Sequence, residues 1–136
     1  MLQTNKLQHF KFGRMTYFNI NEAKEASRHV QMQSKDVLEL NVTLTDTQGI
    51  GIDAMVTLFV DYNAGTQFNI FLTRLMQAYP QLVRADQSIS ADSLVGVQGT
   101  ANSYSKDGYV RMSDFEFSVP APNVDSFQME DDNRQR

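Results

Sequence analysis

The chain has 136 residues, a formal net charge of −4 and no cysteine. This length suits one domain with one hydrophobic core, and the lack of cysteine excludes disulfides, thiolate zinc sites and thiol nucleophiles. No stretch approaches the roughly 18 apolar residues of a membrane span, and the start MLQTNKLQHFKF lacks the apolar run of a signal peptide. We therefore expect a soluble, cytoplasmic protein.

Positive charge is concentrated at the front of the chain. The first 35 residues hold six lysine and arginine residues against two glutamates, a net charge of +4, whereas the rest is acidic. Such asymmetry indicates a surface that faces an anion, or else a solvated mixture of charges.

The first half of the chain predicts three β-strands. The first covers residues 14–20, and the second covers residues 37–45, where apolar and polar residues alternate as in a half-buried antiparallel strand. A turn at residues 46–49 leads to a third strand at residues 52–60, so that these two strands form a hairpin. The polar residues 21–34 predict a long mobile connection, with a helical turn or a strand extension near Val30 and Met32 as alternatives.

The second half predicts one helix and a second hairpin. From residue 66 to residue 79 the large apolar side chains follow helical spacing, Asn63 or Thr66 is available as the cap, and Pro80 prevents continuation. Strands at residues 94–103 and 109–119 flank a turn at residues 106–108. Gly96 and Gly99 in the first of these strands indicate a bulge, sharp coiling or the close approach of another backbone.

This order of elements predicts a mainly β fold, a five-stranded oligonucleotide/oligosaccharide-binding (OB) barrel. In such a barrel one α-helix lies between strands three and four, and the last hairpin closes the wall. An open sheet with the helix packed across one face has the same order of elements and is the alternative. We expect the domain to cover residues 1–122 and residues 123–136 to form a flexible acidic tail.

The run from about residue 14 to residue 119, most of the chain, and an acidic segment near the end resemble the small single-stranded-DNA-binding proteins of phage replication modules from Gram-positive hosts, and less closely those of bacteria. The resemblance lies in Met15 to Ile20, Gln33 to Thr45, the helix Phe68 to Tyr79, Leu94-Val95-Gly96, Tyr104 to Val110 and Met129 to Asp132. It implies binding of single-stranded DNA in replication or recombination, homo-oligomers such as dimers or tetramers, contacts with replication or recombination proteins, and a location in the host bacterial cytoplasm.

The resemblance also implies a role for the acidic tail. Glu130, Asp131 and Asp132 are the candidates for recruiting partner proteins, and a solubilising end is the other interpretation. Bacterial proteins of this type commonly finish in an acidic tip with a terminal hydrophobic residue, whereas this chain ends in Asn133-Arg134-Gln135-Arg136. Any recruitment by this tail must therefore differ in detail.

A groove for single strands needs cations for phosphates and aromatic faces for bases. In an OB barrel it crosses strands two and three between the loop that joins strands one and two and the loop that joins strands four and five. The predicted DNA-binding residues are Arg14, Tyr17, Lys24, Arg28, Lys35, Phe59, Tyr62, Tyr104, Lys106, Tyr109 and Arg111.

Several of these residues have a second interpretation. Because adjacent strand residues face opposite sides, Phe18 is predicted in the core and Tyr17 at the surface. Phe59 is either a stacking platform or a subunit contact, and Tyr104 and Tyr109 can instead pack on one another across their hairpin. Glu39 lies on the same predicted face and repels phosphate.

The sequence predicts no enzyme, cofactor or metal. The two histidines, His9 and His29, lack metal-site spacing, and Gly49-Ile50-Gly51 lacks the rest of a phosphate-binding pattern. The rival function is a protein-interaction or assembly module built on the same barrel. An oligosaccharide-binding barrel is disfavoured because the chain has no tryptophan to stack on a sugar.

Overall fold

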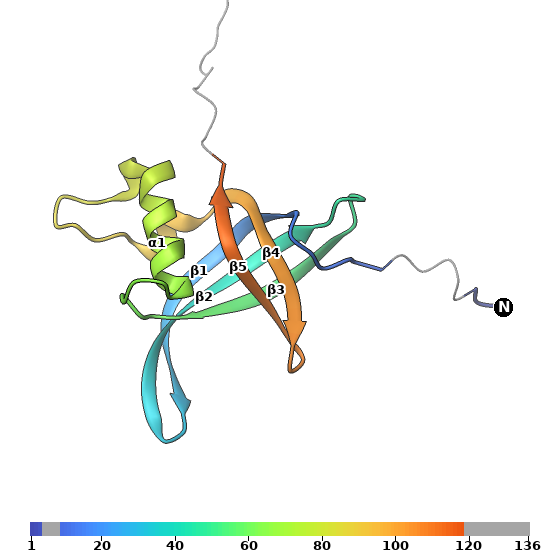
Figure 1. Cartoon of the computed structure of the whole chain (residues 1–136), viewed down its shortest axis with the longest axis horizontal. Helices are drawn as coiled ribbons and strands as arrows, with labels where there is room; N and C mark the ends of the chain where they lie inside the picture. The colour runs from blue at the N-terminus through green and yellow to red at the C-terminus, as the bar shows by residue number, and fades with distance from the viewer. Residues whose placement is uncertain (4–8, 119–136) are drawn as a thin grey trace, which may run out of the picture.

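The computed structural model describes residues 1–3 and 9–118. The elements in this part of the chain are β1 (Thr16–Val30), β2 (Gln33–Thr45), β3 (Gly51–Phe59), α1 (Gln67–Ala78), the short 3₁₀ helices η2 (Pro80–Leu82) and η3 (Ala91–Leu94), β4 (Gln98–Lys106) and β5 (Tyr109–Phe117). All pairings are antiparallel, and the strands form one open sheet in the order β3-β2-β1-β4-β5 (Figure 1). The predicted mainly β class and order of elements are confirmed. No helix among the described residues is long and apolar enough to span a membrane.

The prediction of a long mobile connection at residues 21–34 was wrong. β1 continues to Val30 and β2 begins at Gln33, with partners in register from Glu22 opposite Asn41 to Val30 opposite Gln33. A register shift between Ile20 and Glu22 inserts one extra residue, so the buried positions Ile20 and Ala23 lie three apart. This bulge breaks the period of two that marks a strand in a sequence.

We call residues 21–36 the arm, of which residues 27–36 form a two-stranded ribbon. β3 pairs with β2 only from Val37 onward, and β4 pairs with β1 only as far as Asn19. At the tip, Gln31 and Met32 have φ angles of 51° and 64°. The arm projects from the bottom of the view in Figure 1, on the same side as the turn between β4 and β5.

The predicted hairpin of β2 and β3 is confirmed. Leu38, Leu40, Val42 and Leu44 of β2 are buried on the core face, and Val56 and Leu58 of β3 face them. In the turn, the Asp46 carboxylate accepts the backbone N–H groups of Lys11, Gln48 and Ile50, each over 2.9 Å. Burial raises the pKa of Asp46, but these three hydrogen bonds together lower it, and the net direction is downward.

The helix matches its prediction. Thr66 caps α1 by accepting the N–H of Asn69 over 3.1 Å, and α1 ends one residue before Tyr79, ahead of Pro80. α1 packs against β5, where Arg74 donates to the carbonyl of Phe115 over 2.9 Å and the Tyr79 hydroxyl donates to the carbonyl of Ser118.

β4 differs from its prediction at both ends. It begins at Gln98 instead of residue 94, because residues 91–94 form η3, and it continues to Lys106. Gly96 has a φ of +90° and donates to the carbonyl of Ile20 over 2.8 Å. At Gly99 a Cβ atom would lie 2.0 Å from the carbonyl oxygen of Glu116, so this glycine permits the predicted close approach of another backbone. The β4–β5 ladder has a register shift between Thr100 and Asn102.

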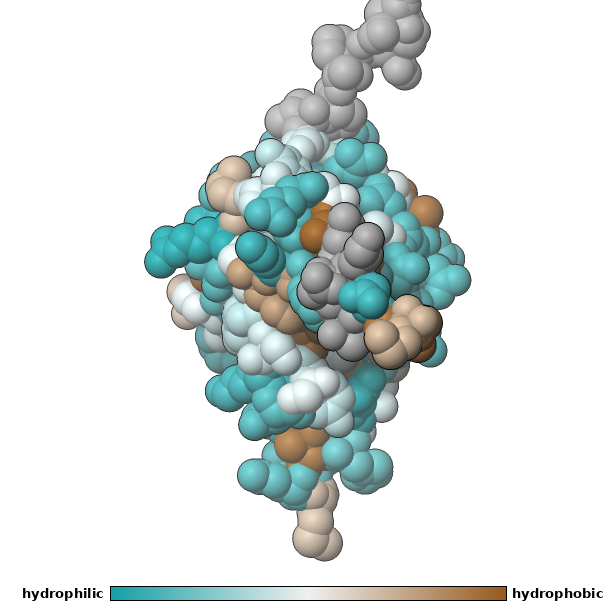
Figure 2. All heavy atoms as spheres, turned by 90° about the vertical axis from the view of Figure 1, so that its right-hand side faces the viewer, coloured by the Kyte–Doolittle hydropathy of each residue, from teal (hydrophilic) through white to brown (hydrophobic). Residues whose placement is uncertain are grey.

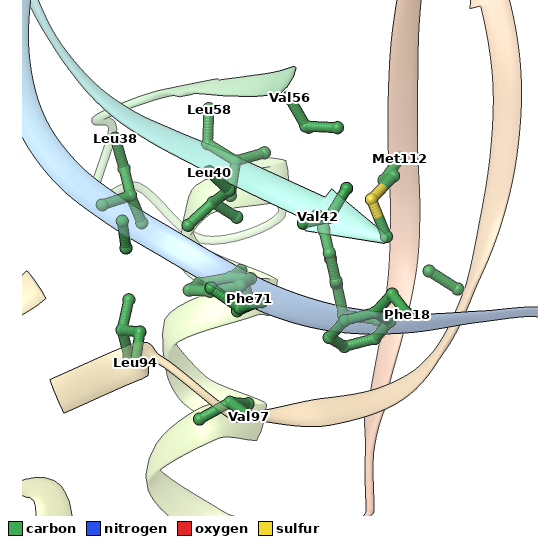
Figure 3. Packing of buried hydrophobic residues seen from close by; sticks show 14 of the residues in the cluster. Phe18, Leu38, Leu40, Val42, Val56, Leu58, Phe71, Leu94, Val97 and Met112 are labelled. Carbon is green, nitrogen blue, oxygen red and sulfur yellow. The ribbon is translucent and has the colours of Figure 1, made fainter. Parts of the chain in front are cut away.

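The core lies between the sheet and α1. Phe71 packs edge to face on Phe115 with ring centroids 5.0 Å apart, and Phe18 does so at 5.7 Å. Figure 3 shows how side chains from β1, β2, α1, η3 and β5 meet there. Phe18 is buried and Tyr17 is half exposed, as predicted.

Candidate functional site

A surface hollow of about 250 Å³ lies where β3 comes near β5. We call it the β3–β5 hollow. It brings together three of the predicted site residues, Phe59 from β3, Tyr104 from β4 and Arg111 from β5. Its other lining residues are Thr57, Leu58, Asp61, Thr66, Gln67, Phe68 and Met112.

Strand parity explains why these three side chains face outward. Leu58 and Met112 are buried in the core, so their neighbours Phe59 and Arg111 lie on the outer face. Tyr104 pairs with Arg111 across the β4–β5 ladder and shares that face. Phe59 is 42% exposed and Tyr104 is 38% exposed, so both rings are accessible.

Arg111 is the cation of this hollow. Its guanidinium carbon lies 5.8 Å from the centre of the Tyr109 ring, within the range of a cation–π contact. Its Nε atom is buried without a hydrogen-bond partner, and Arg111 forms no ion pair within residues 9–118. A guanidinium with donors to spare beside two aromatic faces suits an anion attached to a planar group.

The β4–β5 turn extends this surface. Lys106 and Tyr109 face each other across the hairpin and are both exposed. Asp107 and Gly108 form its tight two-residue turn with φ angles of 54° and 79°. Tyr104 lies opposite Arg111 and Tyr109 contacts Arg111, so the arginine lies between the two tyrosines in the ladder.

The basic residues of the arm have an acidic partner. Arg28 donates to Oε2 of Glu39 from Nη2 over 2.6 Å and from Nε over 3.1 Å, and the Lys24 ammonium lies 3.6 Å from Oε1. The Arg28 hydrogen bonds lower the pKa of the Glu39 carboxyl, burial opposes them, and the charges of Arg28 and Lys24 add to the lowering. Glu39 thus offsets part of the positive charge predicted to face phosphate.

Lys35 completes the basic face of the arm. It lies opposite Arg28 in the β1–β2 register and is exposed. Together with Lys24 and Arg28 against Glu39, it leaves this group with a net charge of +2. Lys24 and Arg28, which fall in the segment predicted as a mobile connection, lie instead on paired strands, as does Lys35.

Of the remaining predicted residues, those that the structure describes do not line the hollow. Arg14 and Tyr17 are exposed near the start of β1, and Tyr17 is eleven positions from Arg28 along that strand, on the order of 30 Å in an extended chain. Tyr62 follows β3 and packs edge to face on Phe68 at 5.3 Å, where it lines a different cavity, next to α1. Glu130, Asp131 and Asp132 lie outside the described residues.

Met32 is a surface feature that the sequence analysis did not select. It is 98% exposed at the tip of the arm, next to half-buried Val30. Figure 2 shows apolar side chains at the lowest point of the molecule, which is the arm in Figure 1, on a face that is otherwise largely hydrophilic. The only sequence signal for it was an apolar residue within a polar segment.

No protein-family model, curated protein or solved structure matches the chain.

Proposed function

We propose that this chain is a non-enzymatic protein that binds single-stranded DNA without sequence preference, on the outer surface of an OB-type barrel. Phosphates are neutralised by arginine and lysine, and bases stack on aromatic side chains.

The topology supports the barrel. The strand order β3-β2-β1-β4-β5 with a helix between β3 and β4 is that of an OB fold in which the outer strands β3 and β5 meet. Cα atoms of these two strands approach within 8 Å, and residues of both line the β3–β5 hollow.

The single observation that carries the proposal is the grouping of Phe59, Tyr104 and Arg111 in that hollow. These are the residue types that single-strand binding requires, and two distant segments contribute them. The arm with Lys35 and the β4–β5 turn with Lys106 project on the same side of the molecule (Figure 1). In an OB barrel the connections at these two positions in the chain flank the groove.

The biological setting is a further part of the proposal and rests on the resemblance. The protein acts in phage DNA replication or recombination, in the host cytoplasm, as a homo-oligomer. Exposed Met55 and Phe59 on β3 suit a subunit contact as well as a DNA contact. Light scattering after size exclusion, with and without oligonucleotide, measures the oligomeric state.

The test is a fluorescence-anisotropy titration of a labelled thymidine oligonucleotide of about 30 nucleotides at low and moderate salt, with duplex DNA as competitor. We expect salt-sensitive binding that duplex does not displace. Replacing both Phe59 and Tyr104 by alanine should weaken binding by at least tenfold, since stacking contributes about 1–3 kcal/mol per base. Met76→Ala, at an exposed apolar residue of α1 that does not line the hollow, is the control.

Absence of binding at low salt would reject single-strand binding and favour the rival protein-interaction module. Binding that the double replacement leaves unchanged would reject the β3–β5 hollow as its site.

A further inference from the structure

A second cavity, of about 410 Å³, lies beside α1, and we call it the helix cavity. Its floor consists of Leu38 from β2, Phe71 from α1 and Leu94 from η3, which Figure 3 shows pointing toward a common space. Leu72 and Met76 of α1 and Ile89 from the following loop form its walls. Its size falls within the range of about 300–1,000 Å³ for ligand-binding pockets.

The mouth of the helix cavity is apolar and accessible. Met76 is 41% exposed, and the exposed Tyr62 ring also lines the cavity. Leu72 and Ile89 are half buried. Contact between water and the apolar walls of an open cavity is unfavourable in free energy. An apolar side chain of a partner that fills the cavity removes this contact and so stabilises the complex.

The charged residues that line the helix cavity are both acidic. Glu25 on β1 and Asp36 on β2 lie on the core-side face of the arm at its base, and both are exposed. Neither forms an ion pair within residues 9–118, and the Asp36 carboxylate accepts only the Ser27 hydroxyl, over 3.3 Å. The cavity therefore carries two unneutralised carboxylates next to apolar walls.

This charge distinguishes the helix cavity from the β3–β5 hollow. Two carboxylates without a cation among the lining residues repel phosphate, so the cavity is unsuited to a nucleic-acid strand, whereas the hollow is lined by Arg111 as well as Asp61, which form no ion pair within residues 9–118. The two sites share Phe68 of α1 but differ in their other lining residues, and only the hollow offers a cation to a ligand.

We propose that the helix cavity is a docking site for a partner protein segment that inserts apolar side chains and carries lysine or arginine beside them. The apolar anchors fill the space between α1, η3 and β2, and the cations pair with Glu25 and Asp36. This interaction is separate from DNA binding and lets one domain hold a strand and a protein at once.

The test uses two labelled peptides of about twelve residues. In one, leucine and phenylalanine alternate with lysine, and in the other glutamate replaces every lysine. We expect the lysine peptide to bind at least tenfold more tightly and to shift the methyl NMR signals of Leu72 and Met76. Met76→Lys should abolish this binding, and Glu25→Lys combined with Asp36→Lys should reverse the preference. All three positions are exposed, and thermal denaturation checks that the variants fold.

Met55→Lys is the matched control, because Met55 is 49% exposed on β3 and lies outside the helix cavity. Affinity for the thymidine oligonucleotide should be unchanged in Met76→Lys, so failure of this proposal is distinguishable from failure of DNA binding. Absence of peptide binding, equal binding of the two peptides, or shifts of Leu72 and Met76 caused by the oligonucleotide would each overturn the proposal.

Discussion

Arg111 has an aromatic neighbour at 5.8 Å and a buried Nε atom without a hydrogen-bond partner among the described residues. Burial of an unpaired donor costs free energy that a bound acceptor recovers. The side chain is therefore held ready for an anion by its surroundings.

Arg111→Gln is predicted to weaken binding of the thymidine oligonucleotide by about tenfold. It should also reduce the slope of log affinity against log salt concentration by about 0.7, the value for one phosphate contact on a single strand. Anisotropy titrations at several salt concentrations measure both quantities. Arg84→Gln, an exposed arginine outside the hollow, should change neither, and an unaltered slope in Arg111→Gln would remove this residue from the site.

Glu39 links the charge of the arm to pH. Its pKa is lowered from the ordinary value of 4.5, so the carboxylate's contribution to stability is fully present above pH 4.5 and is lost as the pH falls through the lowered pKa. Glu39→Gln should reduce the free energy of unfolding at pH 7 by up to about 1 kcal/mol, because its partners are partly exposed.

Chemical denaturation of both proteins from pH 7 to about pH 2 tests this prediction, since the difference between them should decrease as the pH falls below 4.5. The same variant releases Lys24 and Arg28, so its DNA affinity at pH 7 should rise if the arm contacts the strand. A constant stability difference over this pH range would contradict the assignment.

At the scale of elements, the β4–β5 hairpin depends on Gly99. Any side chain there meets the Glu116 backbone, which cannot move without breaking the ladder. Gly99→Ala is predicted to destabilise the domain by about 3 kcal/mol or more, as for severe overpacking. Gly13→Ala, where a Cβ atom meets nothing within 4 Å, is the control. Thermal denaturation compares them, and equal midpoints would contradict the close approach.

The elements also show what the sequence could reveal. Strict alternation predicted β2 and β3, and helical spacing with Thr66 and Pro80 predicted α1. The arm was missed because one bulge residue shifted the pattern and because its polar strands bury little apolar surface. The start of β4 was predicted too early because Leu94 and Val97 are apolar and buried, as strand residues would be. Leu94 instead belongs to a 3₁₀ helix, and Val97 to an irregular link before β4.

At the scale of the whole molecule, the candidate site arises from the pairing of distant segments. Local patterns predicted that Phe59, Tyr104 and Arg111 lie at the surface, but no local pattern gives the approach of β3 to β5 that brings them together. The Arg28–Glu39 pair was likewise hidden, because it depends on the register of the arm.

Hydrogen–deuterium exchange tests this assembled site. Addition of the thymidine oligonucleotide should slow amide exchange in β3, in β5 and in the β4–β5 turn together, because one DNA strand would cross both edges of the β-sheet. Amides of residues 72–78 in α1 and of residues 83–91, none of which lines the hollow, serve as the internal control and should keep their rates. Protection confined to a single strand would contradict a site shared by β3 and β5.

The position of β1 in the sheet has a consequence for folding kinetics. Its pairing with β2 closes a short loop, from Val30 to Gln33, whereas its pairing with β4 joins Thr16 to Ala101 across most of the domain. Closing the longer loop costs more chain entropy, and this cost arises before the contacts between β1 and β4 can stabilise the pair. The β1–β2–β3 meander should therefore form first, and docking of β4 on β1 should set the rate at which the chain reaches its native state.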